Sequence, residues 1–130
     1  MQISLNDLTE EDRNKLLEEA KEEIRLRDEQ MQIERRLVCS KTKLYSTQEE
    51  RVSHILCNDR YSGRMFCDRI RNVANYIYKA IKNLPSSKQL KFTNDNQFDL
   101  YETIYVRLTD AVVDIFEEAK KILEEQNNAN

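Results

Sequence analysis

The sequence has few of the residues that make turns, disulfides and catalytic sites. Its 130 residues include one Gly, one Pro, one His, three Cys and no Trp. Hairpin-rich β folds need turn residues at short intervals, so this composition excludes them and favours an all-α fold. The cysteines at 39, 57 and 67 are odd in number and contain no close pair, which argues against a disulfide framework and favours a reducing compartment.

Long apolar runs are also missing. No segment approaches the roughly 20 apolar residues of a membrane span, and the N-terminal residues have neither the basic start nor the apolar run of a signal peptide. We therefore expect a cytoplasmic protein that does not enter a membrane. The length predicts one domain, over residues 1–126, followed by a disordered tail over residues 127–130.

Charged residues are abundant and unevenly distributed along the chain. They make up 35% of the residues, with a net charge of -3. Residues 1–33 carry 5 basic and 10 acidic side chains, residues 34–91 carry 13 and 5, and residues 92–130 carry 3 and 9. The basic middle segment is either neutralised within the fold or displayed to a polyanion or an acidic protein surface, and net charge alone does not decide between these.

Hydrophobic periodicity predicts a small bundle of about four helices. A long acidic helix over residues 9–39 begins at a Thr9 cap, and a polar link follows it. A basic, helix-turn-helix-like middle over residues 46–84 restarts at a capping box from Ser46 to Glu49, turns at "NDRYSG" and ends before Pro85. A C-terminal heptad-patterned helix covers residues 95–125, and we expect it to form an antiparallel hairpin with the helix before it.

The third helix has an apolar stripe that we expect to face the core. Its residues are Phe66, Ile70, Val73, Ile77, Ala80 and Leu84. They follow one another at steps of three and four, which is the spacing of one helical face.

Two helices carry seams that we expect to serve a homo-oligomer. The candidate interface residues are Leu17, Ile24, Met31 and Val38 in the first helix, and Val112, Ile115, Ala119 and Ile122 in the last. At about 1.5 Å per residue, the first helix would extend on the order of 43 Å, too long for a compact chain of this size. It therefore overhangs the body, bends or pairs with another chain.

The candidate binding surface lies around the corner between the second and third helices. Its residues are Arg60, Tyr61, Arg64, Met65, Arg69, Arg71, Tyr76 and Lys79. Tyrosine and arginine are the residues that most often anchor protein interfaces. We expect a non-enzymatic regulator or inhibitor, without a cofactor, that docks on a protein partner through this surface.

Nucleic acid is the alternative partner. The stretch "YSGRMFCDRI", residues 61–70, resembles the recognition half of helix-turn-helix regulators. In this alignment Tyr61, Phe66 and Ile70 are the inward anchors, and the arginines at 60, 64, 69 and 71 point outward. The resemblance implies a DNA-binding transcriptional regulator. The preceding half departs from the motif, because Leu56, Asp59 and Arg60 stand where a small residue, a buried aliphatic and a glycine are usual.

A metal site and a cysteine enzyme are the least favoured interpretations. Cys39, His54, Cys57 and Cys67 are the right types and number for a closed zinc site, but their spacing contains no C-x2-C pair. Free cysteines are commonly buried as small hydrophobes, so packing explains them more simply. The arginines around Cys67 would lower the pKa of its thiol, but the chain offers no second histidine and no glycine-rich loop.

Overall fold

Three α-helices make up the structure, a computed structural model that describes residues 8–56 and 60–129. They are α1 (Glu10–Leu56), α2 (Arg60–Ile81) and α3 (Asp95–Asn128), and these ranges contain no strand. The predicted all-α class is confirmed. The predicted number of about four helices is wrong, because the first two expected helices are one.

The 47-residue α1 continues through the predicted polar link. Leu37, Leu44, Gln48 and Val52 are all buried, so one face of the helix keeps packing across residues 39–46. The hydroxyl of Thr42 donates to the carbonyl oxygen of Val38 at 3.1 Å, so this polar side chain has a hydrogen-bond partner within the helix. No Gly or Pro interrupts this segment, and the capping box predicted at Ser46 lies inside the helix.

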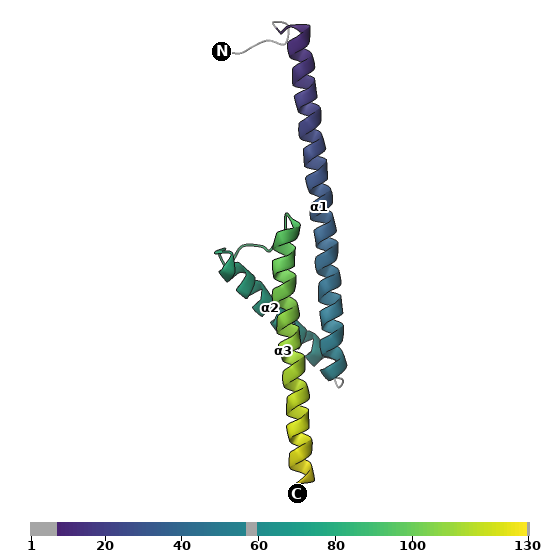
Figure 1. The fold of residues 1–130 in the computed structure, drawn as a ribbon, viewed down its shortest axis with the longest axis vertical. Coiled ribbons are helices and arrows are strands. Elements are labelled where there is room, and N and C mark those ends of the chain that lie inside the picture. Colours follow the sequence, from purple (N-terminus) through teal and green to yellow (C-terminus); the bar gives the residue numbers. More distant parts are fainter. Residues whose placement is uncertain (1–7, 57–59, 130) are drawn as a thin grey trace.

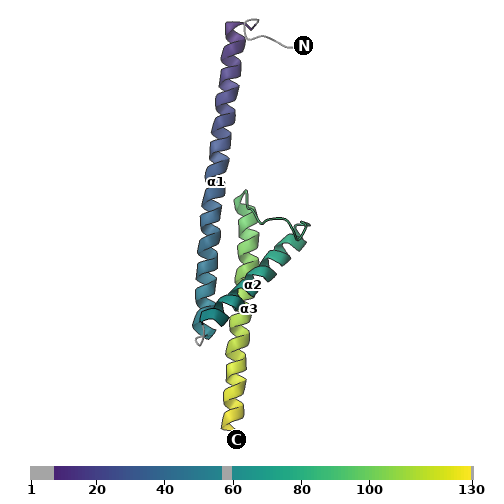
Figure 2. The same ribbon diagram turned by 180° about the vertical axis from the view of Figure 1, so that it is seen from behind.

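The helices form an elongated body with an overhang at each end. α1 and α3 run side by side in the same direction, and α2 crosses them obliquely (Figures 1 and 2). The first half of α1 projects beyond the body at one end, and the last part of α3 projects at the other (Figure 1). The predicted hairpin of two long antiparallel helices is therefore replaced by an oblique crossing of α2 on α1 and α3.

Aromatic side chains from all three helices and from the α2–α3 connection fill the core. Tyr101 is fully buried at its centre, with ring centroids 5.8 Å from Tyr78, 5.1 Å from Phe92 and 6.2 Å from Tyr45. A smaller cluster of Val52, Cys67 and Ile70 continues toward the corner between α1 and α2. These contacts hold the second half of α1 and the first half of α3 together.

Local chemistry fixes the ends of the connection between α2 and α3. Asn83 takes a φ of 60° and the Leu84 amide donates to the Lys79 carbonyl at 2.8 Å, which closes α2 with a Schellman-type turn before Pro85. Asn94 caps α3 by accepting the Gln97 amide at 2.9 Å.

α3 continues to Asn128, so residues 127 and 128 are helical where a disordered tail was expected. None of the described helices has a stretch apolar and long enough to span a bilayer.

Candidate protein-interaction surface on α2

The outer face of α2 is the line of residues opposite its buried side. The buried residues are Cys67, Ile70, Ala74 and Tyr78. At about 100° per residue, the residues on the opposite line are Met65, Arg69, Asn72, Val73, Tyr76 and Ala80. We call this set the outer face, and all six residues are exposed.

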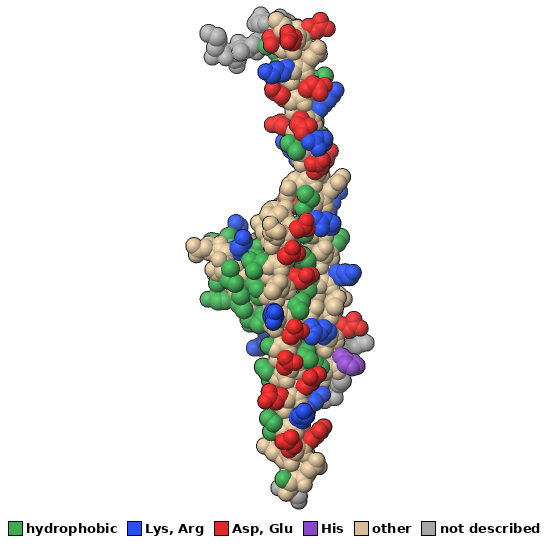
Figure 3. All heavy atoms as spheres, in the orientation of Figure 1, with side chains coloured by type: hydrophobic (Ala, Val, Ile, Leu, Met, Phe, Trp, Pro, Cys, Tyr) green, Lys and Arg blue, Asp and Glu red, His purple; other side chains and the backbone are tan. Residues whose placement is uncertain are grey.

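Three apolar side chains on this face are exposed to solvent. Met65 is 43% exposed, Val73 47% and Tyr76 69%. Hydrophobic side chains also gather beside α3 on the side where α2 lies (Figure 3). Exposed apolar residues that line up on one helix are typical of a surface that binds another protein.

The positions predicted to face the core on this helix are partly wrong. Val73 and Ala80, which the spacing placed in the core, are exposed, whereas Ala74 and Tyr78 are buried. α2 crosses its neighbours obliquely (Figure 1), and its buried line includes the small residue Ala74 and the large ring of Tyr78, which both belong to the aromatic core. Sequence reasoning therefore missed Asn72, Val73 and Ala80 as members of the exposed surface.

Two of the predicted arginines are displayed. Arg64 and Arg69 are exposed, and no ion pair between described residues engages either of them. Among the described side chains of α2, the exposed charges are Arg64, Arg69 and Asp68, so the surface around the outer face has a small net positive charge. The side chains of Arg60 and Tyr61, also predicted for this surface, lie outside the described part of the chain.

Arg71 points inward instead. Its guanidinium forms an ion pair with Glu49 of α1, and Cζ lies 3.9 Å above the ring centroid of Tyr45. Burial alone would lower the pKa of Arg71, but the charge of Glu49 and the interaction with Tyr105 raise it above the ordinary value. Arg71 thus joins α2 to α1 and stays charged, and we leave it out of the binding surface.

Lys79 lies at the flank of α2 and is only half-exposed. Its ammonium donates to the carbonyl oxygen of Ser86 at 3.1 Å. This hydrogen bond ties the side chain to the α2–α3 connection rather than extending it into solvent.

Cys67 does not have the environment of a nucleophile. Burial raises the pKa of its thiol, and the charge of Glu49 adds to this, whereas a reactive cysteine needs its pKa lowered. Cys39 is exposed and Cys57 lies outside the described residues. Over residues 8–56 and 60–129, no group of three or more His, Cys, Asp or Glu side chains is placed to hold a metal ion.

The two predicted oligomer seams lie partly on the overhanging segments and partly on the body, where Val38 and Val112 are placed. Leu17, Ile24, Met31 and Val38 are all exposed on α1, as are Ile115, Ala119 and Ile122 on α3, whereas Val112 is half-buried. None of these exposed residues contributes to the core of the body.

Comparisons with protein families, with curated proteins and with solved structures find no match to this chain.

Proposed function

We propose that this chain is a binding protein that docks on a protein partner through the outer face of α2, and that it acts as an accessory regulator or inhibitor. The observation that carries the proposal is the exposure of Met65, Val73 and Tyr76 in one line beside Arg69. The face fits a partner segment that offers an apolar strip with acidic side chains on its edge. Such docking regulates by occupying a surface that another molecule needs.

Self-association is part of the proposal. The exposed seam residues of α1 are too many and too regular to be left to solvent without cost, because each buried apolar side chain contributes about 1.5–3 kcal/mol. We infer that these residues are covered in a homo-oligomer.

The test compares partner capture by the wild type and by single variants. Tyr76→Ala and Arg69→Glu should each weaken binding about tenfold or more, which corresponds to about 1.4 kcal/mol. Arg107→Glu is the matched control, because Arg107 is exposed on α3 opposite its buried residues and undergoes the same charge change. Equal capture by all four proteins would refute the outer face as the docking surface.

DNA binding is the second candidate, and the exposed side chains of Arg64 and Arg69 favour it. A DNA-binding protein should hold a mixed-sequence duplex at about 50 mM salt and lose orders of magnitude of affinity at about 200 mM. Steep salt dependence that disappears in the Arg64→Glu, Arg69→Glu double variant would favour DNA over a protein partner.

A further inference from the structure

The exposed seam of α1 extends from the free arm onto the body. Leu17, Ile24, Met31 and Val38 are 53%, 58%, 43% and 57% exposed and recur every seven residues. A repeat of seven keeps these side chains along one stripe of the helix. The seam is narrow, because the companion positions of the heptad are Ala20, Arg27 and Glu34.

No described part of the chain buries the arm, residues 10–32, although Nε2 of Gln30 donates to the carbonyl oxygen of Thr93 at 2.9 Å. Every residue in it is exposed, and ion pairs such as Arg25–Glu29 at 2.6 Å and Lys21–Glu18 at 3.8 Å link side chains of the same helix. Isolated helices gain little from such pairs, about 0.2–0.5 kcal/mol each, and most helices in proteins depend on packing of an apolar face. A partner on the seam would supply that packing.

The charges along α1 indicate what the partner is. Residues 10–23 carry seven acidic and three basic side chains, whereas residues 32–45 carry four basic and one acidic. Two parallel copies would bring acidic segments together and basic segments together. Two antiparallel copies, with Leu17 opposite Val38 and Ile24 opposite Met31, bring each acidic segment against a basic one.

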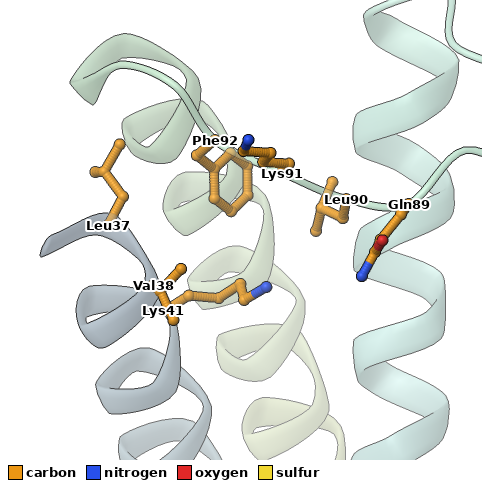
Figure 4. Close-up of a pocket in the computed structure, with 7 residues that line it drawn as sticks. All are labelled: Leu37, Val38, Lys41, Gln89, Leu90, Lys91 and Phe92. Atoms are coloured by element: carbon orange, nitrogen blue, oxygen red, sulfur yellow. The ribbon is translucent and has the colours of Figure 1, made fainter. Parts of the chain in front are cut away.

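A groove on the body lies where the acidic arm of a second copy would end. It is lined by Leu37, Val38 and Lys41 of α1 and by residues 89–92 of the α2–α3 connection (Figure 4). Phe92, Leu90 and Val38 provide apolar walls, and Lys41 provides positive charge (Figure 4). Lys91 also lines the groove, with its ammonium 3.5 Å from Oε1 of Glu34 in an ion pair. The last seam residue, Val38, is therefore also part of a basic, apolar-walled groove.

We propose that two copies of this chain pair through antiparallel α1 helices, with the acidic arm of each seated against the basic end of the seam and the groove of the other. The inference rests on the proposed self-association and adds its orientation and register. Apolar contacts along the seam provide the packing, and the opposite charges of the facing segments select the antiparallel direction. Parallel pairing would leave the two acidic arms in mutual repulsion.

Disulfide trapping tests the orientation. Leu17→Cys and Val38→Cys are made separately in the full chain with Cys39→Ser and Cys57→Ser, one of them with a tag of different mass. The two proteins are mixed, allowed to exchange and mildly oxidised. Antiparallel pairing predicts a mixed disulfide in the mixture and no disulfide-linked dimer of either protein alone.

The other outcomes separate the inference from the proposed self-association. Self-linked dimers of each protein alone would establish parallel pairing and overturn the inference while leaving self-association standing. A dimeric mass by light scattering without any disulfide would place the interface elsewhere and also overturn it. A monomeric mass at all concentrations would overturn both.

A pair of glutamate variants tests the seam independently. Ile24→Glu should raise the dimer dissociation constant at least about tenfold, because it places a charge in the paired stripe. Leu26→Glu is the matched control, since Leu26 is 51% exposed but lies two residues on, on nearly the opposite side of the helix. A larger effect of Leu26→Glu than of Ile24→Glu would contradict the proposed seam.

Discussion

The hydroxyl of Tyr101 joins all three helices, and its removal gives the sharpest test of the core. It donates to Oδ1 of Asn75 in α2 at 2.5 Å and lies 2.8 Å from the hydroxyl of Tyr45 in α1. Because the Tyr101 hydroxyl donates its proton to Asn75, it accepts a hydrogen bond from the Tyr45 hydroxyl. Tyr101→Phe removes both hydrogen bonds and leaves the ring and its aromatic contacts in place.

The expected cost follows from the groups left without partners. A hydrogen bond contributes about 0.5–1.5 kcal/mol, and Tyr101→Phe removes two of them between half-buried partners, so it should lower the free energy of unfolding by about 1–3 kcal/mol. Tyr101→Ala also removes the fully buried ring and should cost about 3–5 kcal/mol. Tyr76→Phe, which removes a hydroxyl from an exposed ring, should change stability by less than about 0.5 kcal/mol.

Urea denaturation followed by circular dichroism measures these differences. The protein concentration is kept constant because self-association stabilises the folded chain by mass action. If Tyr101→Phe matches the wild type within about 0.5 kcal/mol, the hydroxyl does not join the helices as described, and the packing of α2 must be reconsidered.

Two further predictions concern neighbouring features of the core. Leu37→Ala should cost about 2–5 kcal/mol while Leu26→Ala costs far less, because Leu37 is 1% and Leu26 51% exposed; equal losses in thermal or urea unfolding would contradict the packing of α1. Burial raises the pKa of Tyr105 to about 12, above its value in the unfolded chain, so its contribution to stability is full below about pH 10 and is lost as the pH rises to about 12. Unfolding free energies measured across this range should fall less steeply in Tyr105→Phe, and parallel slopes for the two proteins would refute the assignment.

The sequence predicted the elements whose signals are local. Pro85 placed the end of α2 within three residues, and the heptad pattern beginning at Phe98 identified α3. The all-α class followed from the near absence of Gly and Pro. Each of these features depends on residues close together in the chain.

The features that sequence reasoning missed depend on tertiary contacts. Ser40 and Thr42 looked like a link, but Leu37 and Leu44 on the same face pack against the core and keep α1 helical through them. The buried line of α2 was misplaced by about one residue: Ala74 is fully buried and Val73 is 47% exposed, because the way α2 crosses α1 and α3 (Figure 1) determines which of its lines faces the core. Tyr76 and Tyr78 both fall outside the expected stripe; Tyr76 is exposed, as that position predicts, but Tyr78 is buried.

The inward position of Arg71 has the same origin. Nothing near it in the chain distinguishes it from Arg64 and Arg69, which remain exposed. Glu49 lies 22 residues earlier on α1 and meets Arg71 only after the two helices have crossed. Which arginines form contacts inside the fold and which remain exposed therefore depends on the tertiary structure and does not follow from the local sequence.

The central claim is that the outer face of α2 contacts a protein, and site-specific photo-crosslinking tests it most directly. A benzophenone amino acid replaces Tyr76 in one protein and Arg107 in another, and both are irradiated in an extract containing the native partners. We predict covalent adducts with a discrete protein from position 76 and none of that mass from position 107. Adducts with nucleic acid at position 76, or no adduct there at all, would contradict the proposed docking surface.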